Sequence, residues 1–296
     1  MKKIKKILSV MLLVVMISMV SFASNVFAAE KVTTEVDAAP YIKTVYEKML
    51  TLKNYHADIA INIKTDLVNV AVNNSSDIEV KPMQYKSELQ FTMTDVTNRS
   101  TSSKMTQYME QGDNQLITYS EMDGKWSKQT FPYVDKKNSA TYGMKLIKKA
   151  VVTNENDNEK IIQVTMDNKV LKEMTLDILK QSGKEYKEYS TFIETIFSAL
   201  GDINYIINVD KNTNTVTHLH IDLSEATQKS VLAMINQSTI PEKSKTQLKD
   251  MFSNATVVLD CDYSNFNQVS PIEIPQEVKE SVVEQTANSS VVPTNI

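Results

Sequence analysis

The stretch Tyr41–Lys64, YIKTVYEKMLTLKNYHADIAINIK, contains the change of hydrophobic period that decides the fold. Its first half carries apolar residues at four-residue spacing in two sets, Tyr41/Val45/Met49 and Ile42/Tyr46/Leu50. Residues four apart share one side of a helix, so this half is predicted to be an amphipathic helix. From Tyr55 to Ile63 apolar and polar residues alternate, which predicts a strand with one buried face.

Alternating segments continue along the chain and indicate a large antiparallel sheet. The strongest runs from Met83 to Thr94, with one apolar and one polar parity. Further strands are predicted at 101–110, 115–121, 126–131, 161–166, 203–209, 215–223 and 255–266. The Asp123-Gly124 pair predicts a hairpin turn, and clusters of Asn and Asp are expected to take the turn role of glycine, of which the chain has 5. The Asn/Ser-rich segment 67–81 is predicted to be a loop with its tip at 73–76.

Helical spacing returns in segments that are expected to cover one face of this sheet. They lie at 141–150, 170–179 and 189–200, and two more begin at Ser224 and Pro241. The predicted fold class is therefore α+β, a curved antiparallel sheet covered by helices.

The N-terminal 28 residues have the pattern of a secretory signal peptide. Four lysines precede the apolar run Ile7–Ala23, and Val26-Phe27-Ala28 offers a cleavage site. The alternative is an uncleaved anchor, because about 17 apolar residues is the lower limit for crossing a membrane. No lipobox cysteine follows the run, so we expect an extracellular or cell-wall-associated protein whose membrane contact is transient or through an uncleaved leader. Residues 29–276 are expected to form one domain and 277–296 a mobile tail.

Charge argues against nucleic acid as a partner. The whole chain has a net charge of −4, and loss of the four leader lysines leaves 28 basic against 36 acidic residues, or −8. Lys and Glu are interleaved, and the chain has one arginine, Arg99. Nucleic-acid binding needs clustered positive charge.

Residues with catalytic or metal-binding chemistry are few. His218 and His220 have a spacing by which both imidazoles could reach one metal, but no second group of ligands is apparent, so we interpret them as exposed strand histidines. Asp260 and Asp262 are interpreted as solubilising acids rather than an acid/base pair. The single cysteine, Cys261, lies on the apolar parity of its strand and is expected to be a buried thiol. No catalytic site, metal or cofactor is predicted.

The apolar parity of the helix and strands is the remaining candidate for function. It is rich in Met, Ile and Phe, which suit both irregular cores and adaptable apolar pockets. The predicted ligand lining is Val45, Met49, Ile59, Ile61, Leu89, Phe91, Met93, Met105 and Ile117. An ordinary filled core is an equal alternative at this point.

The layout resembles one known superfamily. The leader, the helix–strand stretch YIKTVYEKMLTLKNYHADIAINI, the segment YMEQGDNQLITYSEMDGKWSKQTF (108–131) and the ending SPIEIPQEV (270–278) together resemble the LolA/LolB and LppX-like lipoprotein carriers, especially secreted Gram-positive members. The resemblance covers residues 38 to 280. It implies a half-barrel of about eleven antiparallel strands whose concave face is closed by helices and holds a lipid or acyl chain. Many relatives carry a lipobox cysteine, which this chain lacks, and no catalytic residue or carrier partner transfers.

These observations predict an exported, non-enzymatic protein that binds a hydrophobic ligand, such as a lipid, acyl chain or lipopeptide, at the cell envelope. The alternative is an envelope-associated protein-interaction or sensor module with a filled core and no ligand. An envelope protein is a possible partner in either case.

Overall fold

The computed structural model describes residues 38–113, 115–122, 124–132, 146–182, 194–280 and 283–284. The predicted leader (1–28) and residues 141–145 and 189–193 of two predicted helices lie outside these ranges. Within the described ranges, no helix has both the length and the hydropathy that crossing a membrane requires.

The described chain begins with the predicted helix–strand pair, and strands β1 to β8 follow the first helix in succession. The elements are α2 (Ala39–Leu50), β1 (Asn54–Lys64), β2 (Val68–Val80), β3 (Met83–Asp95), β4 (Ser100–Gln111), β5 (Gln115–Met122), β6 (Lys125–Pro132), β7 (Ile147–Glu155), β8 (Glu159–Met166), α4 (Asn168–Ser182), β9 (Ile203–Asp210), β10 (Thr215–Asp222), α6 (Ser224–Gln237), α7 (Glu242–Ser253), β11 (Thr256–Ser264), α8 (Gln276–Glu280) and β12 (Val283–Glu284). Residues 194–200 are also helical.

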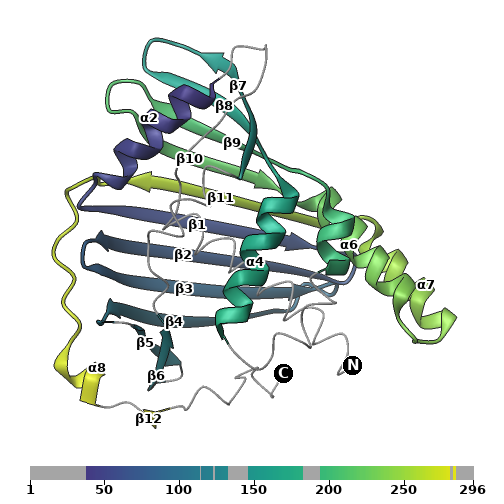
Figure 1. Ribbon diagram of the computed structural model, residues 1–296. Helices are drawn as coiled ribbons and strands as arrows, with labels where there is room; N and C mark the ends of the chain where they lie inside the picture. Colours follow the sequence, from purple (N-terminus) through teal and green to yellow (C-terminus); the bar gives the residue numbers. More distant parts are fainter. Residues whose placement is uncertain are drawn as a thin grey trace.

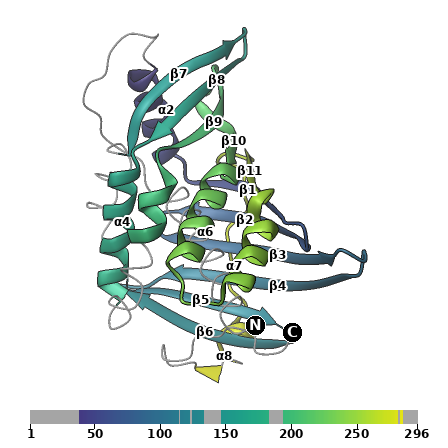
Figure 2. The ribbon, with the colours of Figure 1, turned by 90° about the vertical axis from the view of Figure 1, so that its right-hand side faces the viewer.

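The strands form one open sheet in the order β12-β6-β5-β4-β3-β2-β1-β11-β10-β9-β8-β7. All neighbours are antiparallel except β12, which pairs in parallel with β6. The β1–β11 pairing joins the two halves of the sheet, and it places His56 opposite Ser264. The sheet bends around α2 and α4, which lie on one of its faces (Figures 1 and 2). The predicted α+β class with a curved, open antiparallel sheet is confirmed.

Helix α2 packs onto this face through one side of its cylinder. Ile42 and Val45 are completely buried, and Tyr46 shares a hydrogen bond of 3.0 Å between its hydroxyl and that of Tyr205 on β9. Leu50, by contrast, is 40% exposed. The two stripes of the sequence therefore merge into one buried face, and burial of each large apolar side chain stabilises the fold by roughly 1.5–3 kcal/mol.

Two predicted elements are wrong. Segment 67–81 is the strand β2, because its alternating valines and its Asn and Ser residues are hydrogen-bonded between β1 and β3 on both sides. Residues 147–150, predicted to end a helix, begin the strand β7, because this segment pairs with β8. Both errors arise in segments whose composition or short apolar spacing fits a strand as well as a loop or a helix. Pairing with a neighbouring strand then determines that the segment is a strand.

Asparagine takes the turn role of glycine, as predicted. Positive φ angles occur at Asn98, Asn214, Asn265 and Asn267. Asparagine tolerates this region because its side chain bonds to nearby backbone. The β5–β6 hairpin has Gly124 at φ +75° and pairs Met122 with Lys125, in agreement with the predicted turn.

The C-terminal segment folds back along the ends of the strands (Figure 1). The side chain of Asn54 holds Val269 through two hydrogen bonds, and the backbone N–H of Ile272 donates to Glu79 at 3.1 Å. Val278 of α8 is buried, and Lys279 pairs with Glu110 at 2.8 Å. Within the predicted tail, residues 277–280 belong to α8 and residues 283–284 form β12, whereas residues 285–296 lie outside the described ranges.

Candidate functional site

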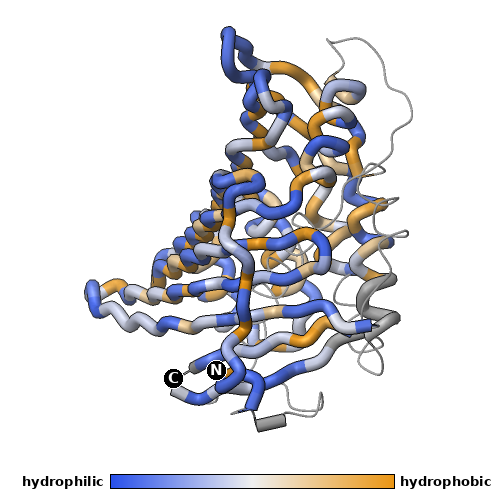
Figure 3. Tube along the Cα trace, turned by 90° about the vertical axis from the view of Figure 1, so that its left-hand side faces the viewer, coloured by the Kyte–Doolittle hydropathy of each residue, from blue (hydrophilic) through white to orange (hydrophobic). Residues whose placement is uncertain are grey.

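The two faces of the sheet have different chemistry, and cross-strand pairing assigns each side chain to one of them. We call the face that α2 and α4 cover the helix face, and the opposite one the outer face. Paired residues of antiparallel strands share a face, and successive residues alternate between faces. Figure 3 shows the long strands in its lower half pale or blue over much of their length, whereas orange segments are frequent in the upper half.

On β7–β11 the helix face is a filled core. Four side chains of the neighbouring strands β8 and β9 have no exposed surface at all: Ile162, Val164, Ile207 and Val209. Leu219, Ile221, Leu259 and Cys261 continue this layer toward β1. In the described part of the chain, these core side chains of β8–β11 are already removed from water.

On β1, β3 and β4 the helix face is only partly covered. Ile59, Leu89 and Met105 lie in one cross-strand row, with Asn74 between the first two. Phe91 and Met93 belong to the next two rows of β3. All five apolar side chains are half-buried. Ile59, Leu89, Phe91 and Met93 also pack against the main core. The structure thus brings five predicted lining residues together on one incompletely covered surface, which we call the β1–β4 apolar surface.

The other four predicted lining residues lie elsewhere or are already covered. Ile61 adjoins the surface but is only 3% exposed, and Val45 of α2 is fully buried in the core. Met49 is half-buried against that core. Ile117 lies on the outer face, where it pairs with Glu110 and packs with Tyr108, Tyr119 and Val278 of α8.

A polar row crosses the helix face beside the apolar surface. Ser76, Ser87, Gln107 and Ser120 are paired in register across β2 to β5. The Ser87 hydroxyl donates to Asn74 at 2.6 Å, and the Gln107 amide donates to Ser120 at 3.0 Å. Ser76 and Ser87 are buried, so this row adds hydrogen-bonding groups next to the apolar one.

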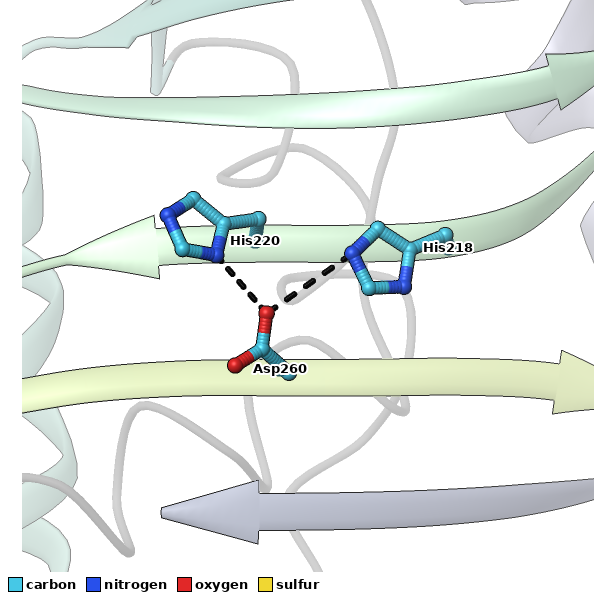
Figure 4. Close-up of side chains that lie close together, drawn as sticks. All are labelled: His218, His220 and Asp260. Atoms are coloured by element: carbon cyan, nitrogen blue, oxygen red, sulfur yellow. Dashed lines mark hydrogen bonds and ion pairs between the residues drawn. The ribbon is translucent and has the colours of Figure 1, made fainter. Parts of the chain in front are cut away.

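The outer face carries all three histidines of the chain, each against a carboxylate from a neighbouring strand. His218 Nδ1 lies 2.7 Å from Asp262 Oδ1, and His220 Nδ1 lies 2.7 Å from Asp260 Oδ1. Figure 4 shows both imidazoles on β10 turned toward Asp260 of β11. Both histidines lie on the polar parity of their strand, as the sequence analysis places them, and the register of β10 with β11 adds the contacts to Asp260 and Asp262.

The third pair lies two strands away. His56 Nδ1 is 2.7 Å from Asp77 Oδ1, and its Nε2 is 3.2 Å from Asp58 Oδ1. Partial burial alone lowers the pKa of His56, but the hydrogen bonds to Asp77 and Asp58 outweigh it, so the pKa lies above its usual value. Asp58 stands directly opposite Asp262, which places two carboxylates side by side on the outer face. The sequence could not reveal these contacts, because they depend on the register of three separate strand pairings.

Cys261 lies on the helix face near four tyrosines, Tyr46, Tyr55, Tyr205 and Tyr263. Burial raises the pKa of the Cys261 thiol to about 12 and that of Tyr46 to about 12. Tyr55 and Tyr263 pack edge to face with ring centroids 6.0 Å apart, and burial raises the pKa of both hydroxyls. A neutral, buried thiol is a poor nucleophile, and the predicted buried Cys261 is confirmed.

Comparisons with known proteins give no family assignment. No family model and no curated protein matches the chain. Among solved structures, the lipoprotein LppX of Mycobacterium tuberculosis matches with a TM-score of 0.37 and 10% identity over 79% of this chain and 97% of that one. A DUF1329 family protein from Desulfovibrio piger matches with a TM-score of 0.24 and 8% identity over 78% of this chain and 92% of that one. Likenesses at these scores establish neither family nor function, so the resemblance to lipoprotein carriers stays a prediction.

Proposed function

We propose that this chain is an exported, non-enzymatic protein that binds a lipid, acyl chain or lipopeptide on the helix face of its sheet, at the cell envelope. One observation supports the proposal most strongly. Ile59, Leu89 and Met105 form a cross-strand row of apolar side chains that are only half-buried. On the same face of β8 and β9, by contrast, Ile162, Val164, Ile207 and Val209 are completely buried. Such a surface gains free energy when an apolar ligand removes it from water.

The residues at this surface suit a flexible ligand of that class. Met93 and Met105 have unbranched, polarisable side chains that adapt to different apolar shapes. Gln107, which is only half-buried, stands one row away, where a polar head or linkage of an amphiphile would meet its amide. Acyl chains combine these two requirements.

A second candidate function has one observation in its favour. Val45 and Ile61, which were predicted to contact ligand, are buried within the ordinary core. If that core continues across the whole helix face, the protein is an envelope-associated interaction or sensor module without a ligand. The test below separates the two functions.

The experiment compares one substitution on each face. Leu89→Gln places an amide in the β1–β4 apolar surface, whereas Ile206→Gln makes the same kind of change at an outer-face side chain that is 37% exposed. Binding is measured by fluorescence titration with a labelled fatty acid, and lipid in the purified protein is identified by solvent extraction and mass spectrometry. We expect the wild type and Ile206→Gln to bind equally and Leu89→Gln to bind at least about tenfold more weakly, the equivalent of 1.4 kcal/mol.

Two results would count against the proposal. One is the absence of extracted lipid together with no fatty-acid binding by the wild type, which would favour the module without a ligand. The other is equal weakening by Leu89→Gln and Ile206→Gln, since binding would then not distinguish the two faces. Urea unfolding of both variants verifies that the chains are folded under the assay conditions.

A further inference from the structure

Three side chains on the outer face converge on one point from two neighbouring strands. His218 and His220 are two residues apart on β10, so both imidazoles project from the same face. Asp260 of β11 is directly opposite His220 in the strand register. One nitrogen of each imidazole and one carboxylate oxygen all lie within 4.8 Å of one another. The Oδ1 atom of Asp260 stands between the two rings (Figure 4).

We propose that His218, His220 and Asp260 form a binding site for a divalent transition-metal ion, with zinc as the ion best suited to the donor set. Two imidazoles and one carboxylate are ligands that zinc accepts, and three protein ligands with one open position describe a four-coordinate site completed by water. Nothing in the proposed lipid-binding function requires this site, which lies on the opposite face of the sheet.

The distances are close to those of a coordinated ion. Asp260 Oδ1 is 2.7 Å from His220 Nδ1 and 3.7 Å from His218 Nε2. Ligand atoms of a tetrahedral zinc site with bonds of about 2.0–2.1 Å are roughly 3.3 Å apart. The first separation is shorter than this value and the second longer, so small rotations of the Asp260 carboxylate equalise them. The side chains are 31–37% exposed, which leaves room both for these rotations and for the entry of an ion.

A hydrogen bond behind the site fixes the orientation of one ligand. His218 Nδ1 lies 2.7 Å from Asp262 Oδ1, while its Nε2 faces Asp260. When Nδ1–H donates to a carboxylate, Nε2 is left with a lone pair for the metal, which is the usual arrangement of an oriented metal-binding histidine. Asp262 is therefore a positioning residue for His218.

The charge around the site also favours a cation. Asp262 stands opposite Asp58 across the β11–β1 pairing, and like charges in this relation are destabilising. Among the described residues, the recorded ion-pair partners of Asp58, Asp260 and Asp262 are histidines, with no lysine or arginine. A bound divalent ion would supply the positive charge that this part of the outer face lacks.

The test uses calorimetric titration of the protein, produced without a histidine tag, with Zn²⁺ alone. We expect one zinc per chain in the wild type. His218→Gln and His220→Gln should each weaken binding at least about 100-fold, and Asp262→Asn, which removes only the orienting carboxylate, about 10- to 100-fold. His56→Gln is the matched control, because it removes the third histidine–aspartate pair of the same face and should leave the zinc affinity unchanged.

A second readout keeps a folding defect from imitating the loss of a ligand. Zinc should raise the melting temperature of the wild type and of His56→Gln but not that of His220→Gln, because a ligand stabilises the native state that it binds. Co²⁺ should give the visible absorption bands of a tetrahedral site in the same two proteins. The proposal is overturned if the wild type binds no zinc, if both β10 histidine variants bind it as the wild type does, or if His56→Gln loses it equally.

Discussion

Each histidine of this chain has an aspartate of a neighbouring strand as its nearest charged partner, and the consequences differ from residue to residue. At His218 and His220 two pairs meet at a shared carboxylate. His56 shares neither of its two aspartate partners with another histidine, and its hydrogen bonds to Asp77 and Asp58 raise the imidazole pKa. The separate pair is therefore the better place to measure what one such contact contributes to stability.

We predict that the contribution of His56 to stability is larger in acid than in weak base. Its pKa in the folded state is raised above the ordinary value of about 6.5, so the stabilisation is complete below that value and is lost as the pH rises through the folded-state pKa. His56→Gln should lower the free energy of unfolding by about 0.5 kcal/mol at about pH 5.5 and by less at about pH 8.5. Urea unfolding of both proteins at both pH values measures this difference; an equal loss at the two values would contradict it.

The buried, hydrogen-bonded pair of Tyr46 and Tyr205 affects stability at alkaline pH. Burial raises the pKa of Tyr46 to about 12, against an ordinary value of 10.0. Between these values the unfolded chain ionises while the folded chain stays neutral, so stability is full below pH 10 and falls as the pH rises toward 12.

Tyr46→Phe should cost about 1 kcal/mol at neutral pH, because the hydrogen bond to Tyr205 is lost. It should also make the alkaline fall in stability shallower. Urea midpoints at about pH 8 and pH 11 test both statements. A fall of unchanged steepness in the variant would show that Tyr46 does not contribute to it.

At the scale of single elements, α2 acts through one buried side. Val45 is completely buried and Leu50 is 40% exposed on the same helix. We predict that Val45→Ala lowers the free energy of unfolding by about 2 kcal/mol, through lost burial and the cavity that remains. Leu50→Ala, which removes a larger side chain, should change it by less than about 0.5 kcal/mol. Equal effects in urea unfolding would mean that α2 is peripheral to the core.

The short helix α8 makes a comparable prediction on the outer face. Val278 is 3% exposed and forms a small core with Tyr108 and Tyr119. Val278→Ala should therefore destabilise the protein by about 2 kcal/mol, with Glu277→Ala as a control that changes little. Increased hydrogen exchange of β5 and β6 in the Val278 variant would locate the effect. A neutral result would return this segment to the mobile tail that the sequence predicts.

The sequence predicts an element correctly where the spacing of apolar residues within that segment is enough to distinguish a helix from a strand. The alternation from Tyr55 to Ile63 and the helical spacing before it are local, and both elements form where predicted. Ile117 shows the limit, because alternation gives a residue's parity but not which face of the sheet that parity meets. β2 shows another, since its Asn and Ser residues are strand residues only because β1 and β3 satisfy the backbone on both sides.

At the scale of the whole molecule, the unpredicted information lies in long-range register. β10 and β11 are separated in sequence by α6 and α7, so no local signal places Asp260 opposite His220. The β1–β11 pairing likewise decides that the N-terminal meander continues the sheet of β7–β11. That single pairing places a filled half of the helix face beside a partly exposed half, and this contrast underlies the proposed function.

The most direct test of the proposed function is the position at which a bound acyl chain contacts the protein. A fatty acid carrying a photoactivatable diazirine is bound and cross-linked, and the modified peptides are identified by mass spectrometry. Binding on the β1–β4 apolar surface predicts cross-links in peptides that contain Ile59, Leu89 or Met105, which Leu89→Gln strongly reduces. Cross-links confined to outer-face positions such as Ile206, or none above a control without light, would contradict it.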